Sequence, residues 1–200
     1  MERDSELFWD ERYRNEDAVP ERGPAAFLVE HHHLLPERGR GLDVAMGTGR
    51  NALYLASLGY EVTGIDVSGV AVERCREEAE RRGLRIEAVQ ADLGSYRLPS
   101  EAYDVIIDFY YLQRELAPAL VAALRPGGVL VFESFTTEQR RFGWGPQQEE
   151  FLLRPGELRT LFPGLEELVY REGLVESQSG RGQKAVAGLV ARKRPRPGVE

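Results

Sequence analysis

Short apolar runs alternate with amphipathic stretches along most of the chain. Residues 42–45, 61–65 and 103–107 have the composition of strands that are buried on both faces of a sheet. Between the first two runs, residues 51–58 carry leucines at helical spacing, and Gly59 supplies the left-handed position that ends a helix. This alternation predicts an α/β fold built on a largely parallel sheet.

The same alternation of strands and helices continues along the rest of the chain. Ser68 begins a second helix, Gly83 ends it, and Pro118 begins a third. Four further strands are predicted, at residues 84–89, 129–132, 165–174 and 183–190. A turn rich in Ser, Gly and Gln joins the last two strands, which therefore form an antiparallel hairpin.

Three segments lie outside this alternation. Residues 1–35 predict a helical cap at the N-terminus. Residues 137–150 show no clear period, and loops of this length are uncommon unless they are functional or disordered. The tail, residues 192–200, is basic and rich in proline, so we expect it to be frayed.

Composition and charge exclude several classes of protein. With 200 residues and 42% hydrophobic content, residues 1–200 can bury one core, and we expect a single domain. The net charge of -7 disfavours nucleic-acid and membrane partners. No apolar run approaches the roughly 20 residues of a membrane span, and the charged N-terminal sequence is unlike a signal peptide. Cys75 is the only cysteine, so we expect a reducing, cytoplasmic environment.

The glycine-rich turn after the first strand is the candidate ligand loop. Gly47 and Gly49 allow the backbone to approach a ligand closely, and with Ala52 they also satisfy the dinucleotide pattern. Asp43, just before the loop, would repel a pyrophosphate but suits the ammonium and sulfonium of S-adenosylmethionine (SAM). The carboxylate of SAM can lie on the amides that begin the following helix. The charge pattern therefore favours SAM over a nicotinamide dinucleotide.

An acidic residue closes each of four successive predicted strands. These residues are Asp43, Asp66, Asp92 and Asp108. Because the carboxyl ends of parallel strands share one edge, we expect the four carboxylates to line one rim. There Asp66 can accept both ribose hydroxyls and Asp92 the adenine amino group. A single such residue can be a solubilising strand end, but four in succession indicate a binding site.

Aromatic and histidine side chains near the N-terminus each allow two interpretations. Trp9 and Tyr13 fall on one helical face, where they either cap the core or face the sulfonium of the cofactor. Residues 31–33 are consecutive histidines, whose side chains point about 100° apart on a helix and cannot converge on one ion. We therefore expect no metal site.

These motifs resemble those of the class I SAM-dependent methyltransferases. Residues 43–49 resemble motif I, Asp66 the ribose-binding acid, residues 91–93 the adenine-binding segment, and residues 124–128 the turn before the fifth strand. The resemblance implies a Rossmann-like sheet of seven strands in the order 3-2-1-4-5-7-6. It also implies that strand 7 is antiparallel and that helices cover both faces.

Two shorter segments narrow the resemblance. Residues 8–13 and 47–52 are similar to the tellurite-resistance-type and thiopurine-type small-molecule methyltransferases. The cofactor site that we expect comprises Trp9, Tyr13, Asp43, Ala45, Gly47, Gly49, Arg50, Asn51, Asp66, Val67, Asp92, Leu93 and Asp108. We expect Tyr111, Arg114 and Trp144 at the substrate, with the Trp144 loop and the N-terminal helix forming a lid.

The chemistry of methyl transfer limits which catalytic residues are needed. The leaving group is a neutral thioether, so alignment and desolvation can supply much of the acceleration. A thiolate, selenite or tellurite acceptor needs no base, whereas an amine or a hydroxyl does. The candidate bases are Asp108, Tyr110, Tyr111 and Glu133. Residues 108–111 lack the prolines of the nucleobase amino-methyltransferases, which disfavours a nucleobase amine.

The sequence thus predicts a methyltransferase that acts on a small molecule, with a thiol or a chalcogen oxyanion as candidate acceptor. Two alternatives are a SAM-binding protein without its own catalysis and, less favoured, an NAD-dependent oxidoreductase. As partners we expect a small-molecule acceptor but no nucleic acid and no membrane, and a chain that acts as a monomer or a homodimer.

Overall fold

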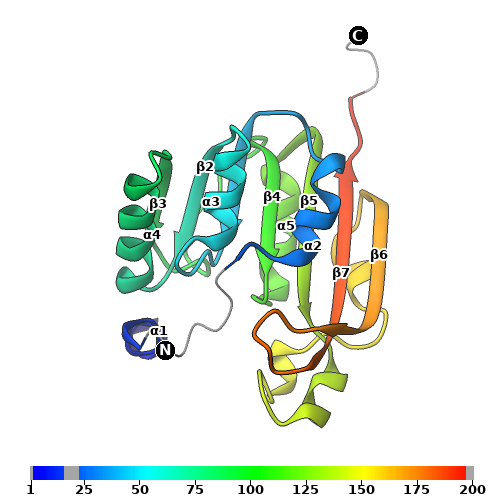
Figure 1. The fold of residues 1–200 in the computed structure, drawn as a ribbon. Helices are drawn as coiled ribbons and strands as arrows, with labels where there is room; N and C mark the ends of the chain where they lie inside the picture. Colours follow the sequence, from blue (N-terminus) through cyan, green and yellow to red (C-terminus); the bar gives the residue numbers. More distant parts are fainter. Residues whose placement is uncertain (1, 16–22, 197–200) are drawn as a thin grey trace.

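The computed structural model describes residues 2–15 and 23–196 and places seven strands in one sheet (Figure 1). The strands are β1 (Arg40–Val44), β2 (Glu61–Asp66), β3 (Ile86–Gln90), β4 (Tyr103–Phe109), β5 (Leu124–Phe135), β6 (Leu165–Glu176) and β7 (Gln183–Lys193). Their order is β3-β2-β1-β4-β5-β7-β6, and β7 runs antiparallel to both neighbours. The topology implied by the family resemblance is confirmed.

Helices cover both faces of this sheet. The α-helices are α1 (Glu2–Arg14), α2 (Ala26–His31), α3 (Arg50–Ser57), α4 (Gly69–Arg81), α5 (Ala117–Ala123) and α6 (Leu158–Leu161). Helices α2, α3 and α4 lie on the face toward the viewer in Figure 1, and α5 lies behind the sheet. Short 3-10 helices occupy His32–Leu34, Arg114–Leu116, Thr137–Phe142 and Glu149–Phe151.

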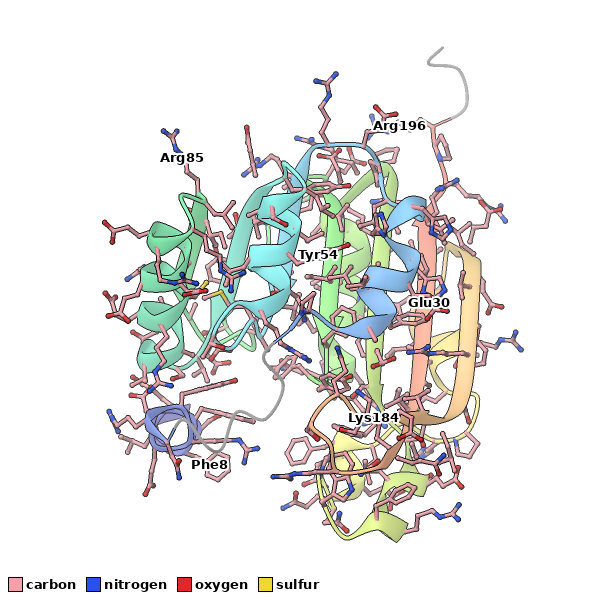
Figure 2. The ribbon with its side chains drawn as sticks, in the orientation of Figure 1. Phe8, Glu30, Tyr54, Arg85, Lys184 and Arg196 are labelled. Atoms are coloured by element: carbon pink, nitrogen blue, oxygen red, sulfur yellow. The ribbon has the colours of Figure 1, made fainter. Side chains whose placement is uncertain are left out.

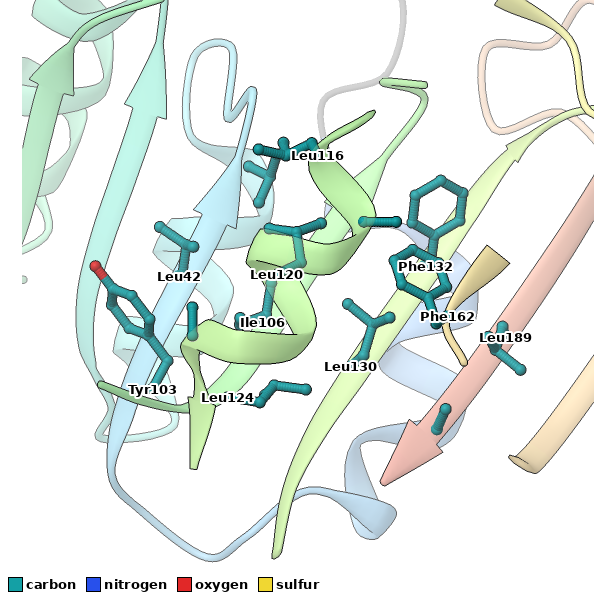
Figure 3. Packing of buried hydrophobic residues seen from close by; sticks show 14 of the residues in the cluster. Leu42, Tyr103, Ile106, Leu116, Leu120, Leu124, Leu130, Phe132, Phe162 and Leu189 are labelled. Atoms are coloured by element: carbon teal, nitrogen blue, oxygen red, sulfur yellow. The ribbon is translucent and has the colours of Figure 1, made fainter. Parts of the chain in front are cut away.

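Alternation along the central strands divides the core into two layers. Val105 and Ile107 of β4 pack with α2 and α3, whereas Ile106 packs with α5 on the opposite face. Figure 3 shows the second layer, in which Leu120 of α5 lies among apolar side chains that include Leu130 and Phe132 of β5. Both faces of β4 are buried, which explains the apolar run 105–107 between Asp104 and Asp108.

The N-terminal region is two separate parts rather than one cap. Helix α2 belongs to the core, where Phe27 and Leu28 are fully buried. Helix α1 instead lies beside the beginning of α4, at the lower edge in Figure 1. Asp10 fastens it there, because its Oδ1 accepts hydrogen bonds from Ser68 Oγ at 2.6 Å and from Val70 N at 3.2 Å. The helices within residues 1–35 therefore do not form one cap, and residues 1 and 16–22 of that range lie outside the described residues.

The segment 137–150 is more regular than its sequence indicates. It contains one 3-10 helix and the start of a second, and a bridge between Thr136 and Leu153 closes its base. The side chain of Gln139 is fully buried; it accepts from Ala185 N at 2.8 Å and donates to Trp144 O at 2.9 Å. A glutamine that satisfies two backbone groups gives this loop order without any apolar period.

Strands β5 and β7 are longer than predicted. Residues 124–128, expected as a turn, fall within β5, but the register with β4 shifts there: Leu124 pairs with Tyr103, and the next pair is Val129 with Val105. Strand β7 continues through Arg192 and Lys193, so the tail begins later than expected. Lys193 Nζ donates to carbonyl oxygens of Val121 and Leu124, which anchors the end of the strand. Residues 197–200 of the predicted tail lie outside the described residues.

Packing against α4 leaves no room for a side chain at Gly49. Its φ is +81°, and a Cβ added there would lie 2.2 Å from Cys75 Sγ in α4. Gly49 is therefore required for the close contact between the loop and α4, which differs from the expected approach to a ligand. At Gly47, with φ +55°, an added Cβ would instead lie 2.7 Å from the Tyr13 hydroxyl of α1.

Candidate functional site

The four predicted aspartates gather at one edge of the sheet. Asp43 and Asp66 stand at the ends of β1 and β2, Asp92 follows β3, and Asp108 lies near the end of β4. Strands β1 and β4 are paired, with Val44 directly beside Asp108. The prediction that parallel strand ends bring these carboxylates to one rim is confirmed by this register.

Asp43 and Asp108 are buried and incompletely hydrogen-bonded. Their exposed fractions are 1% and 2%. Within the part of the chain that the structure describes, Asp43 Oδ2 and Asp108 Oδ1 have no hydrogen-bond partner. Burial raises the pKa of Asp43 to about 8, although the amide of Ala52 and the charge of Arg50 oppose the shift. Burial, and then the charge of Asp43, raise the pKa of Asp108 well above its usual range.

Orphaned buried carboxylate oxygens indicate a site for a cationic ligand. An unpaired charge in the interior is costly, and a positive group placed against it removes that cost. The ammonium and sulfonium groups of SAM have the required charge, whereas a dinucleotide pyrophosphate has the opposite one. Asp43 and Asp108 therefore fit SAM and disfavour a nicotinamide cofactor.

Asp66 and Asp92 orient the backbone around the rim. Asp66 Oδ2 accepts from Gly47 N at 2.7 Å and Oδ1 from Ser68 N at 2.9 Å, so Asp66 joins the glycine loop to the start of α4. Burial raises the pKa of Asp66, while these backbone donors lower it. Asp92 Oδ1 accepts from Gly94 N at 2.8 Å and shapes the turn after β3. Each carboxylate retains lone-pair capacity for ligand hydroxyl or amino groups.

The neighbours of these aspartates contribute to the rim in different ways. Val67 presents its carbonyl to Gln90 Nε2 at 3.3 Å, and the side chain of Leu93 is buried in the core on the α5 side. Ala45 and Tyr110 follow β1 and β4 with φ angles of +50° and +67°. Left-handed backbone at two non-glycine residues is unusual and tends to occur at functional sites.

Helix α1 brings Tyr13 to the glycine loop. The close approach of the Tyr13 hydroxyl to Gly47 places it at the rim, and burial followed by the charge of Asp66 raises its pKa. The ring of Trp9 stacks on Tyr13 with centroids 5.8 Å apart and remains 36% exposed. Of the two interpretations of this aromatic face, the position of Tyr13 favours contact with the ligand.

Two residues predicted to bind the cofactor at the start of α3 have other partners. Asn51 Oδ1 accepts from Ala25 N at 2.8 Å, so its side chain holds the entry to α2. Arg50 donates to Gly23 O at 3.2 Å, and its guanidinium lies 5.7 Å from the ring centroid of Tyr110. These side chains position the chain around the loop, and the backbone amides of α3 remain the candidate anion contacts.

The residues predicted at the substrate also have defined partners. Arg114 binds Glu157 at 2.6 Å and donates to the carbonyls of Glu150 and Leu152, so it braces the loop and does not face an anionic substrate as expected. Tyr111 donates to Gln113 Oε1 at 2.7 Å. The ring of Trp144 meets that of Phe135 edge-on, with centroids 6.1 Å apart.

Tyr110 and Glu133 were predicted from the sequence as candidate bases, but Arg171 of β6 and Lys184 of β7, which join them in one polar cluster, were missed. Tyr110 donates to Glu133 Oε1 at 2.6 Å, and Arg171 donates to Glu133 Oε2 at 2.6 Å. Lys184 Nζ, on a side chain only 3% exposed, donates to the Tyr110 hydroxyl. Figure 2 shows Lys184 at the foot of β7. The signal available in the sequence was that Lys184 is one of only two lysines.

Other candidate ligand sites give no comparable arrangement. His31 and His32 direct Nδ1 to the carbonyls of Phe27 and Val29, at 2.9 and 2.7 Å. Among the described residues, no group of three His, Cys, Asp or Glu side chains is placed to hold a metal ion. A groove of about 610 Å³ involving Arg40 and Arg76 lies at the amino ends of β2 and β3, away from the aspartates. No helix within residues 2–15 and 23–196 is long and apolar enough to cross a membrane.

Comparison with known proteins identifies the family that the chain resembles. Residues 42–128 match the family model described as a methyltransferase domain. A curated relative is the probable SAM-dependent methyltransferase TehB of Haemophilus influenzae, 28% identical over 166 residues. The alignment covers 76% of this chain and 57% of that protein, so the chain spans little more than half the relative's length.

Solved structures of other proteins share the fold of this chain. A protein studied for the conversion of a disulfide bond into a thioacetal group during echinomycin biosynthesis is 26% identical, with a TM-score of 0.71. That alignment covers 95% of this chain and 93% of the other. The N-methyltransferase NodS of Bradyrhizobium japonicum, solved with S-adenosylhomocysteine (SAH), shares the fold with a TM-score of 0.68 and 22% identity. The alignment covers 94% of this chain and 98% of NodS.

Asp43→Asn should stabilise the ligand-free protein at alkaline pH. The pKa of Asp43, about 8, exceeds the roughly 4 of an unfolded aspartate, so ionisation costs stability increasingly between those pH values. Asparagine removes that cost, and we expect a gain of at least about 1 kcal/mol in the free energy of unfolding at pH 8. The gain should disappear as the pH falls toward 4. Denaturant titration at several pH values measures it.

The matched control is Asp104→Asn, in β4 at the opposite end of the sheet. Asp104 accepts from Arg40 N and Arg125, each at 2.8 Å, so its replacement should destabilise the protein at pH 8. If Asp43→Asn destabilised the protein at pH 8 as the control does, the interpretation of Asp43 as a carboxylate that awaits a cation would be wrong.

Proposed function

Because this chain belongs to the class I SAM-dependent methyltransferases, we propose that it transfers the methyl group of SAM to a small-molecule acceptor. The observation that carries the proposal is the pair of buried carboxylates at the ends of β1 and β4, Asp43 and Asp108, with orphaned oxygens beside the glycine loop. Such a pair suits a ligand that is cationic where it meets the strand ends.

The residues of the rim have separate roles in holding the cofactor. Asp43 and Asp108 would face its positive groups, while the amides that begin α3 would receive its carboxylate. Asp66 would accept the ribose hydroxyls, and Asp92 the adenine amino group. When bound, SAM supplies an electrophilic methyl group on a sulfonium whose departure leaves a neutral thioether. The protein then has to align the acceptor and exclude water.

The acceptor that we propose carries sulfur or another chalcogen as its nucleophile. The relative from echinomycin biosynthesis was studied for the conversion of a disulfide bond into a thioacetal group, which is sulfur chemistry, and this chain is 26% identical to it. Arg171 and Lys184 flank the buried carboxylate of Glu133 near the end of β5, which favours an acidic or anionic acceptor. A thiol or a chalcogen oxyanion satisfies both observations.

We further propose that α1 and the Trp144 loop close over the reacting groups. They lie at opposite sides of the lower edge of the sheet in Figure 1, with the ends of β1 and β4 between them. The base of the loop is fixed by Arg114, so movement would be confined to its tip. There Gly143 and Gly145, with φ angles of +67° and +77°, flank Trp144 and allow backbone change.

Calorimetry with SAM, SAH and NAD tests the cofactor directly. We expect SAM and SAH to bind and NAD not to bind. Asp66→Ala should weaken SAM binding by roughly 1.5–3 kcal/mol, because hydrogen bonds to a charged acceptor are lost. Asp104→Ala, at the far end of the sheet, is the control and should leave the affinity unchanged. Binding of NAD, or a folded Asp66→Ala variant with wild-type SAM affinity, would contradict the proposal.

Hydrogen exchange tests the lid. We expect SAH to protect the amides of α1 and of residues 140–148 in addition to those of the glycine loop, since closure would bury both segments. The Gly143→Ala and Gly145→Ala double variant should lose the protection of residues 140–148 while it retains that of the glycine loop. Protection confined to the ends of β1, β2 and β3 in the wild type, even with an acceptor thiol present, would exclude the lid.

A further inference from the structure

The polar cluster beneath the strand ends forms a directed chain of hydrogen bonds. Lys184 donates to the hydroxyl of Tyr110, and that hydroxyl donates to Glu133 Oε1 at 2.6 Å. Arg171 donates to Glu133 Oε2 at 2.6 Å and thereby fixes the other side of the same carboxylate. The four residues come from β5, β6, β7 and the end of β4, so the pairing of these four strands positions the chain of hydrogen bonds.

Burial of the charged groups in this cluster costs free energy that their mutual pairing has to offset. Glu133 and Lys184 are 2% and 3% exposed, and Lys184 Nζ lies 3.8 Å from Glu133 Oε1. Lys184 Nζ also lies 4.7 Å from the centroid of the Tyr110 ring, and the Arg50 guanidinium lies 5.7 Å from it. A phenol placed between cations and a carboxylate is polarised, because its proton is drawn to the carboxylate while the cations stabilise negative charge on its oxygen.

The backbone holds Tyr110 beside the rim. Tyr110 comes two residues after Asp108, and its φ of +67° is left-handed. Its amide donates to Glu133 O at 2.8 Å, and its ring packs on Phe135 with centroids 5.1 Å apart. A strained backbone with both its amide and its ring constrained indicates that the position of the phenol is specified.

We propose that Tyr110 accepts the proton released by the methyl acceptor and passes its own proton to Glu133. Lys184 and Arg171 act as positioning residues, the first for the phenol and the second for the carboxylate. This inference rests on the proposed methyltransferase function and narrows its acceptor. The nucleophilic atom carries a proton in the resting state, as in a thiol, rather than being a preformed oxyanion.

The proton and electron balance of the step is complete. The acceptor atom forms its bond to the methyl carbon with a lone pair, and the pair of the broken carbon–sulfur bond remains on the thioether. The acceptor proton moves to the Tyr110 oxygen while the Tyr110 proton moves to Glu133 Oε1. No oxidant or second co-reactant is needed, and water restores Glu133 to the carboxylate after release of the product.

A cluster that only ties the strands together would behave differently from a relay. Both would lose stability when one member is removed, as a buried pair does when its partner is deleted. Both would also couple the ionisation of the phenol to Lys184 and Glu133 in opposite directions. The relay alone requires in addition that loss of the phenol slow the methylation of a protonated acceptor more than that of an ionised one. Removal of the ammonium should make the phenolate harder to form, and removal of the carboxylate charge should make it easier.

Nuclear magnetic resonance of protein labelled at the tyrosine ring carbon that bears the hydroxyl measures this response. Tyr110→Phe identifies the Tyr110 resonance by its absence. We expect Lys184→Met to raise the midpoint of the Tyr110 titration by about one pH unit or more and Lys184→Arg to restore it. Glu133→Gln, which preserves the shape of the side chain, should lower the midpoint and serves as the test if Lys184→Met does not fold. A midpoint unchanged in Glu133→Gln would overturn the relay.

Turnover of two probe thiols extends the test to the acceptor. With labelled SAM, Tyr110→Phe should reduce kcat on 2-phenylethanethiol, which is largely protonated at pH 7.5 or so, by about 10²–10⁴-fold. It should leave kcat on 4-nitrobenzenethiol, which is ionised at that pH, within about threefold, and SAH affinity should not change. Equal loss on both thiols would overturn the proton-accepting role of Tyr110. Failure of the wild type to bind SAH would instead overturn the proposed function, and an unchanged midpoint in the resonance titration would overturn the relay even if neither thiol is methylated.

Discussion

The carboxylates of Asp43 and Asp108 lie buried in adjacent parallel strands, and the architecture of the rim follows from the need to hold them there. Charges removed from water cost several kcal/mol each, so an unliganded fold favours their protonated forms. The raised pKa values of both residues express this preference. The central strands have apolar residues on both faces, which keeps water away from the pair.

The polar side chains around this pair mainly fix backbone segments in place. Asp66 joins the glycine loop to α4, Asp10 fastens α1 beside that junction, and Asn51 holds the entry to α2. Arg114 braces the loop that bears Trp144. The segments around the rim are therefore already ordered before a ligand binds. Binding would not lose free energy to the ordering of these segments.

Much of the cofactor side was accessible from the sequence because its signals are local. Hydrophobic runs locate the strand ends, and an aspartate at each end identifies the rim without any tertiary information. Tyr110 and Glu133 were accessible as strand-end residues, but Arg171 and Lys184, which complete their cluster, were not. Lys184 reaches the rim only because β7 is antiparallel, which brings the beginning of that strand beside the ends of the others. Arg114 was misassigned for a similar reason, since its partner Glu157 is distant in sequence.

The central claim is that a cationic cofactor binds by pairing with carboxylates that are protonated in the free protein. Calorimetry of SAM binding in buffers of different ionisation enthalpy counts the protons exchanged. With the pKa of Asp43 at about 8, this residue alone should release roughly one proton per SAM bound at pH 7, and fewer as the pH rises above 8. Binding heats that are identical in all buffers at pH 7 would contradict the account, because the carboxylates would then already be ionised without the ligand.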